Sequence, residues 1–204
     1  MSTGSPTAPL EFWFEFASTY SYPAAMRVED AARAAGVPLV WRPFLLAPIF
    51  GAQGWKDSPF NVYPVKGRYM WRDLERVCAK HGVPLQRPSR FPRNGLLAAR
   101  VALLGAGESW GGDFVRSVYR ANFAQDREIS DREVVASLLE EITGDAAGVL
   151  ERAEAADNKD RLRKQTEQAT ELGIFGAPSF VSHGELFWGN DRLEDALAWH
   201  RERA

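Results

Sequence analysis

Cysteine and histidine are scarce in this sequence, and their scarcity excludes several kinds of chemistry. Cys78 is the only cysteine among the 204 residues, so the chain can form neither an internal disulfide, nor a CxxC redox pair, nor a zinc site built from thiolates. The histidines, His81, His183 and His200, are separated in sequence, and we predict no metal site. Dithiol redox chemistry by this chain alone is therefore excluded.

Long apolar runs and an excess of one charge are also missing. The chain has 25 basic and 27 acidic side chains, a net charge of −2, and no window approaching the roughly 18 apolar residues of a membrane span. We therefore expect no nucleic-acid or membrane partner held by positive charge. Residues 1–9 lack the basic and apolar segments of a secretion signal, so we predict a short disordered leader on a cytoplasmic protein. The densest basic stretch, residues 87–93, is predicted to be a solvated loop.

Hydrophobic and aromatic side chains, in contrast, are abundant. The hydrophobic fraction is 45%, and the sequence contains 12 Phe, 7 Trp and 5 Tyr. This composition and length are typical of one globular domain, or of one domain with a large insertion. Most of the aromatic side chains are expected to pack in the core.

The first part of the sequence predicts a strand, a helix and a second strand. Residues 10–16 are dense in aromatic side chains and predict a buried strand. Apolar residues at helical spacing follow, with Pro23 in the first turn and Gly36 just past the end, the usual limits of a helix. Residues 37–44 predict the second strand, which a right-handed crossover would make parallel to the first.

Helical periodicity then continues until the strand pattern returns near residue 175. Helices are predicted at residues 66–82, 94–107, 112–124, 130–142 and 157–172. We expect a capping box of Ser130 and Glu133 to begin the fourth. After Pro178, two short strands flank a His183-Gly184 turn, and a terminal helix follows that Asn190 or Asp191 is expected to cap.

This order of elements is the thioredoxin arrangement. We predict an α/β fold in which a thioredoxin-like domain, residues 10–44 and 174–204, is interrupted by an all-helical insertion, residues 45–173. A compact α+β fold is the alternative.

The turn between the first strand and the first helix is the candidate site. Backbone N–H groups and the helix dipole favour an anion there. Thioredoxin-like oxidoreductases carry a CxxC pair at this place, whereas this chain has Ser18 and Ser21. A serine hydroxyl cannot exchange disulfides, but it can donate a hydrogen bond to a thiolate supplied by a bound molecule. The alternative is that Ser18 only caps the helix; a serine hydrolase is not indicated, since no G-x-S-x-G motif is present.

Four sequence blocks occur in a characteristic order: FWFEFASTYSY at 12–22, NVYPVKGRYMWRD at 61–73, FPRNGLLAAR at 91–100, and FGAPSFV at 175–181 followed by LFWGNDR at 186–192. With these blocks the chain resembles the 2-hydroxychromene-2-carboxylate isomerase family, thioredoxin-fold relatives of the kappa-class glutathione transferases. The resemblance extends from about residue 10 to residue 199.

The resemblance implies a glutathione-dependent isomerase of 2-hydroxychromene-2-carboxylate or a similar aromatic carboxylate. It also implies a homodimer and a role for Ser18 in keeping the thiol of glutathione ionised. Thr19 stands where the family usually has proline, so the backbone at this point keeps its N–H and a freer φ.

Six further residues are implied around glutathione by their positions. Asn61 and Lys66 would line a carboxylate of glutathione or substrate. Ala177 and Pro178 would offer backbone at a cis peptide bond. Asp191 would face the ammonium of the γ-glutamyl group, and Arg192 its carboxylate.

Three aromatic residues, Tyr20, Phe44 and Trp188, flank the predicted site and are candidates to stack on an aromatic substrate, with core packing as the alternative. Two other functions stay open: a kappa-like transferase or peroxidase that uses glutathione as a substrate, and a non-catalytic thioredoxin-fold binding module. Cys78, on the apolar face of a predicted helix, is expected to be buried and inert.

Overall fold

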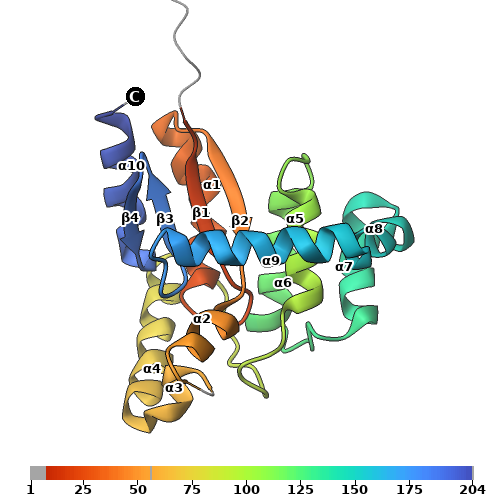
Figure 1. The fold of residues 1–204 in the computed structure, drawn as a ribbon. Helices are drawn as coiled ribbons and strands as arrows, with labels where there is room; N and C mark the ends of the chain where they lie inside the picture. The colour runs from red at the N-terminus through yellow and green to blue at the C-terminus, as the bar shows by residue number, and fades with distance from the viewer. Residues whose placement is uncertain (1–7, 56, 204) are drawn as a thin grey trace, which may run out of the picture.

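Four strands form one mixed sheet in the computed structural model, which describes residues 8–55 and 57–203. Their order across the sheet is β2-β1-β3-β4, with β2 parallel to β1 and β3 antiparallel to both of its neighbours. Most of the predicted leader, residues 1–9, lies outside the described residues. The strands are β1 (Leu10–Phe14), β2 (Leu39–Pro43), β3 (Ser179–Ser182) and β4 (Glu185–Trp188) (Figure 1).

The first two strands and α1 (Ser21–Ala35) form the predicted βαβ unit. Gly36 ends α1 with a φ of 68°, a left-handed conformation that glycine adopts without a steric penalty. The hairpin of β3 and β4 is also confirmed. His183 and Gly184 have φ angles of 50° and 81°, as expected of a two-residue turn with two left-handed positions.

Residues 45–173 contain helices and no strand within their described part. Three short helices, α2, α3 and α8, were not predicted from the periodicity. The helices are α2 (Leu46–Ala52), α3 (Pro59–Val62), α4 (Pro64–Lys80), α5 (Leu96–Gly105), α6 (Gly111–Phe123), α7 (Arg132–Thr143), α8 (Ala146–Glu154) and α9 (Ala156–Glu171).

The predicted caps of two helices are wrong. α7 begins at Arg132, and the Ser130 hydroxyl donates to the Glu128 carboxylate at 2.9 Å instead of capping the helix. A 3₁₀ turn, η1 (Asn190–Arg192), precedes α10 (Leu193–Arg201), and neither Asn190 nor Asp191 makes a capping bond. The Asn190 side chain accepts a hydrogen bond from Arg27. In both cases another partner satisfies the side chain.

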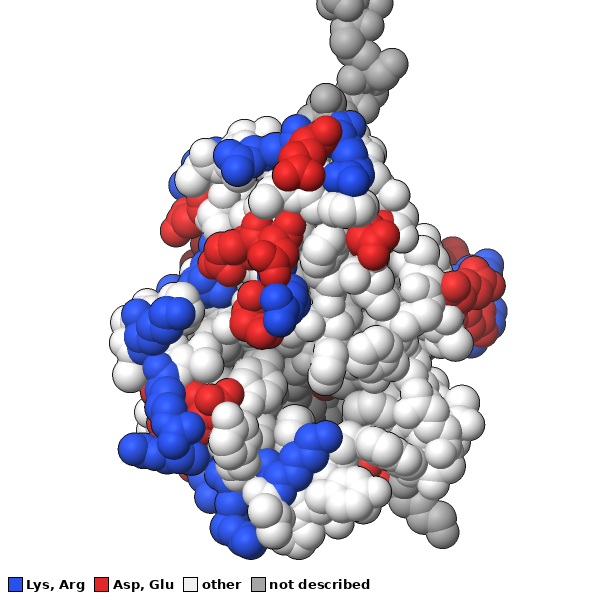
Figure 2. Space-filling model, turned by 90° about the vertical axis from the view of Figure 1, so that its left-hand side faces the viewer, with Lys and Arg blue, Asp and Glu red and all other residues white. Residues whose placement is uncertain are grey.

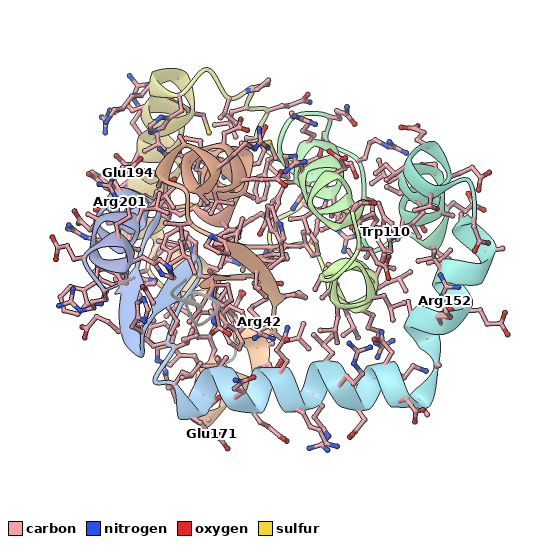
Figure 3. The ribbon with its side chains drawn as sticks, turned by 90° about the horizontal axis from the view of Figure 1, so that it is seen from above. Arg42, Trp110, Arg152, Glu171, Glu194 and Arg201 are labelled. Carbon is pink, nitrogen blue, oxygen red and sulfur yellow. The ribbon has the colours of Figure 1, made fainter. Side chains whose placement is uncertain are left out.

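The two faces of the sheet pack against different helices. Leu10, Phe12 and Phe14 on β1 belong to a large core that includes residues of α1 and of α4 to α10, with Leu162 as the contribution of α9. Trp13 points to the opposite face, where a smaller cluster includes Ala169 of α9. Seen from above, α9 runs along one side of the sheet, and α1 and α10 lie on the other (Figure 3). The large core is continuous from the sheet to the helices.

The basic stretch at residues 87–93 is not solvated throughout, which corrects the prediction. The Arg93 side chain is only 3% exposed, forms ion pairs with Asp126 and Glu128, and donates to the Arg127 carbonyl at 2.9 Å. A buried guanidinium needs such partners, because an unpaired buried charge is strongly unfavourable. Arg93 therefore fixes the loop after α6 to the segment before α5.

Candidate active site

Ser18 lies in the turn that joins β1 to α1, and it connects two distant parts of the chain. Its hydroxyl donates to the Ala177 carbonyl at 2.8 Å and accepts a hydrogen bond from the Ser21 N–H at 3.3 Å. The Ala177–Pro178 peptide bond is cis, as the resemblance implied. Ser18 thus does take part in capping α1, but it also faces the loop before β3, where a ligand could meet both the hydroxyl and the backbone.

The Ser18 turn is held from the inside by Glu15 and Tyr119. The Glu15 carboxylate accepts the Ala17 N–H at 3.0 Å, and the Glu15 carbonyl accepts both the Ser18 N–H and the Tyr119 hydroxyl at 2.9 Å. Burial raises the pKa of Glu15 from 4.5 to about 7, partly opposed by the Ala17 hydrogen bond. Sequence reasoning missed both residues. A glutamate at the end of an aromatic strand is a weak signal, and Tyr119 comes from a helix far along the chain.

Tyr20 lies beside α4, at one edge of the turn. Its hydroxyl donates to the Asp73 carboxylate at 2.9 Å, and its ring centre is 6.5 Å from that of Phe60. Burial raises the pKa of Tyr20 well above its usual value, and Asp73, Tyr69 and Asp191 raise it further. Tyr20 is therefore a neutral hydroxyl whose oxygen can still accept a hydrogen bond.

Lys66 and Asn61 lie on α4 and α3 with exposed side chains. The Lys66 ammonium is 5.8 Å from the centre of the Phe60 ring, the ring that neighbours Tyr20. No ion pair to Lys66 is found among the described residues, so its charge is available to a ligand. The Asn61 amide donates to Asp57 at 3.1 Å.

Asp191 and Arg192 lie on η1, across the turn from α4. Asp191 is close enough to Tyr20 to raise its pKa, and 75% of the Asp191 side chain is exposed. Arg192 pairs with Asp195 at 2.8 Å and with Asp191 at 3.6 Å. A ligand carboxylate would therefore compete with these acids for Arg192.

The surface is hollowed on the side of the molecule where α10, β4 and α4 lie in Figure 1. Figure 2 shows this hollow below the centre of the face, with Lys and Arg side chains along its lower border. Basic side chains at the edge of a hollow favour a ligand that carries carboxylates.

Trp188 and Phe44 differ in what they can offer a substrate. Trp188 is 53% exposed, and its ring packs on Phe175, with ring centres 4.9 Å apart. Its indole also lies against the backbone of Gly176, the residue before Ala177. Phe44 is fully buried and packs against Trp13 in the smaller core cluster. Phe44 therefore has no exposed surface on which a substrate could stack, and it packs in the core instead.

Other reactive groups and cavities lie outside the Ser18 turn. Cys78 is buried in the large core, and burial raises the pKa of its thiol to about 11. Two surface cavities, of about 270 and 310 Å³, lie beside α2 and α9, the first of them also lined by α5, and none of the predicted site residues lines them. Among the described residues, no three potential metal ligands come together, and no helix has the length and apolar character to cross a bilayer.

Comparisons with known proteins agree on the fold. The family described as DSBA-like thioredoxin domain matches residues 9–198. A 2-hydroxychromene-2-carboxylate isomerase of Sphingobium xenophagum is 32% identical over 92% of this chain and 95% of its own. Glutathione S-transferase kappa 2 of Caenorhabditis elegans is 24% identical over 90% of this chain and 88% of its own. A solved 2-hydroxychromene-2-carboxylate isomerase structure superposes with a TM-score of 0.85 at 25% identity, covering 96% of this chain and 95% of that one.

Proposed function

The chain belongs to the DsbA-like thioredoxin domain family and, within it, to the 2-hydroxychromene-2-carboxylate isomerase family, and we propose that it is a glutathione-dependent isomerase of that compound or a similar aromatic carboxylate. Its relatives are named as isomerases and glutathione transferases, which supports an enzyme of this group. The observation that carries the proposal is the Ser18 hydroxyl, 2.8 Å from the Ala177 carbonyl, where disulfide oxidoreductases have a reactive cysteine.

Glutathione fits the groups that surround the Ser18 turn. The hydroxyl and the backbone at Ala177 and Pro178 lie where a peptide bearing a thiol could bind both. In the proposal the exposed carboxylate of Asp191 faces the ammonium of glutathione, and the exposed Lys66 takes a carboxylate. In the proposal Asn61 and Arg192 add contacts to glutathione, and each must first leave an acidic partner: Asn61 is hydrogen-bonded to Asp57, and Arg192 to Asp195.

Ser18 is proposed to keep the bound thiol ionised. An ordinary thiol with a pKa of about 8.5 is only about 3% ionised at pH 7. A helix N-terminus contributes about 0.3–1 kcal/mol and a hydrogen bond to a charged group about 1.5–3 kcal/mol, which together lower a thiol pKa by roughly one to three units. To act in this way, the Ser18 hydroxyl must turn from the Ala177 carbonyl to the sulfur.

Glutathione, when bound, would supply a thiolate for reversible addition to an unsaturated carbon of the ring-opened substrate, and it would be regenerated. The protein's part is to orient and to neutralise charge rather than to form a covalent bond. Lys66 is proposed to hold a carboxylate, while Tyr20 and Trp188 offer aromatic surface to the ring.

A Ser18→Ala variant tests the proposal. We expect turnover of 2-hydroxychromene-2-carboxylate at pH 7, followed by ultraviolet absorbance with and without glutathione, to fall at least about tenfold, because the thiol loses a charge-assisted hydrogen bond. Ser130→Ala, which removes an exposed serine bonded to Glu128, is the matched control and should leave turnover unchanged. Activity of Ser18→Ala within a factor of about two of the wild type would remove Ser18 from the mechanism.

A kappa-like transferase or peroxidase is the second candidate, favoured by the similarity to glutathione S-transferase kappa 2. Glutathione consumption separates the two functions, since a transferase uses glutathione stoichiometrically and an isomerase does not. A calorimetric titration that detects no glutathione binding would instead favour a non-catalytic binding module. Homodimerisation and a cytoplasmic location are further proposals from the family, and sedimentation would test the first.

A further inference from the structure

Glu15 is placed to control the geometry of the Ser18 turn, although it precedes the turn and is partly buried. Its carboxylate accepts the Ala17 N–H at 3.0 Å, and its carbonyl accepts the Ser18 N–H at 2.9 Å. One residue thus accepts hydrogen bonds from two successive backbone N–H groups, those of Ala17 and Ser18. Since this stretch of backbone carries the Ser18 side chain, the direction of the hydroxyl depends on these two bonds.

Tyr119 reinforces the same residue from α6. Its hydroxyl donates to the Glu15 carbonyl at 2.9 Å, and its ring packs on Phe16, with ring centres 5.1 Å apart. On the same helix, the Asn122 amide donates to the Phe16 carbonyl at 3.1 Å. The turn is therefore attached to α6 at two successive residues, and Glu15 is the one that reaches the Ser18 backbone.

Burial makes it costly to ionise the carboxyl group of Glu15, so this group needs a compensating role such as its hydrogen bond to the Ala17 N–H. The pKa of Glu15 is raised to about 7, chiefly by burial, and no charged side chain contributes to the shift among the described residues. Tyr119 is the titratable group that faces it, and the Glu15 charge raises the pKa of Tyr119. Because the folded-state pKa lies above the unfolded value, ionisation of Glu15 lowers stability as the pH rises through about 7. An ionised acceptor, however, makes a stronger hydrogen bond than a neutral amide would.

We propose that Glu15 is a positioning residue that holds the Ala17–Ser18 backbone so that the Ser18 hydroxyl faces the sulfur of bound glutathione. The inference rests on the proposed function. Glu15 acts through Ser18 and contacts neither glutathione nor substrate. Without its hydrogen bond the turn loosens, the hydroxyl meets the sulfur less often, and the thiol pKa rises.

The test measures the pKa of the bound thiol from thiolate absorbance across pH, in the wild type and in Glu15→Gln and Glu15→Leu. The amide keeps a weaker acceptor for the Ala17 N–H, and leucine keeps none. We therefore expect the thiol pKa to rise in the order wild type, Gln, Leu, with a total rise of about one unit and a fall in kcat at pH 7 of about five- to tenfold. The affinity for glutathione should change less than kcat.

The direction in which the thiol pKa changes shows whether Glu15 acts by positioning the turn or through its negative charge. A carboxylate acting through its negative charge alone would repel the thiolate, so both substitutions would then lower the thiol pKa. A lowered or unchanged thiol pKa would overturn the proposal. The matched control is Glu11→Gln on β1, the strand that ends just before Glu15. This variant loses the Arg42 ion pair but leaves the Ser18 turn intact, and its thiol pKa should equal that of the wild type.

Two further measurements keep the test decisive. If Glu15→Leu does not fold, Tyr119→Phe removes the hydroxyl that holds the Glu15 carbonyl and should raise the thiol pKa by a smaller amount, and no rise would overturn the proposal. Glutathione is first titrated into the wild type by calorimetry. No binding there would overturn both the proposed function and the role of Glu15, whereas binding with an unchanged thiol pKa in the variants would overturn the role of Glu15 alone.

Discussion

Trp188 and Phe44 are both aromatic residues at the end of the sheet near the site, but their exposure gives them different roles. Trp188 keeps about half of its surface exposed beside the Gly176 backbone, whereas Phe44 has none. An exposed indole can contribute affinity for a planar ligand, and a buried ring contributes to the free energy of unfolding.

We therefore expect truncation of Trp188 to affect substrate binding and truncation of Phe44 to affect stability. Trp188→Ala should raise the KM for the aromatic substrate about five- to tenfold and change the free energy of unfolding by less than about 1 kcal/mol. Phe44→Ala should lower the free energy of unfolding by about 3–5 kcal/mol, because it leaves a cavity in the smaller core cluster. Steady-state kinetics and urea unfolding measure both. A KM unaffected by Trp188→Ala would exclude stacking on this residue.

At the scale of elements, the position of α3 against α4 depends on one glycine. A Cβ on Gly67 would lie 2.2 Å from the Phe60 carbonyl oxygen, a backbone atom that cannot turn away. These two helices carry Asn61 and Lys66, so their spacing sets where the proposed carboxylate contacts lie.

Gly67→Ala is accordingly expected to separate α3 from α4, to raise the KM for glutathione severalfold and to destabilise the protein by about 1–3 kcal/mol. Gly51→Ala on α2 is the matched control. No atom lies within 4 Å of its added Cβ, so it should be neutral or stabilising by about 0.5–1 kcal/mol. Equal behaviour of the two variants in kinetics and urea unfolding would show that the close contact is not required.

Periodicity predicted the longer helices and the strands, because each buries one face over several turns or residues. It missed α3 and α8, although Ser58 followed by Pro59, and Asp145, are the capping signals that begin them. The Ser130 cap failed since its hydroxyl binds Glu128, and sequence spacing cannot tell which partner wins. Ser18 was found from its place in the fold. Glu15 was not, because its importance lies in contacts with Tyr119 that only the folded chain creates.

At the scale of the whole molecule, the sheet and the inserted helices share one core. The cluster that contains Phe12 and Phe14 also contains Phe114 of α6 and Leu138 of α7. Contacts of this kind couple the stability of the predicted thioredoxin-like domain, residues 10–44 and 174–204, to that of residues 45–173.

Unfolding is therefore expected to be a single cooperative transition. Tryptophan fluorescence and far-ultraviolet circular dichroism, followed in urea, should give the same midpoint, as they do for a two-state domain. Two separated transitions would contradict this expectation and would show that residues 45–173 form an independently stable unit.

Because Cys78 is buried, the protein itself is expected to give no thiolate signal near neutral pH. With its pKa raised to about 11, this side chain stays protonated near neutral pH, and its position in the core keeps labelling reagents away. Any thiolate absorbance or alkylation near neutral pH then belongs to the ligand. The occupancy and ionisation of a bound thiol can thus be read directly on the unmodified chain, without first engineering a cysteine-free variant.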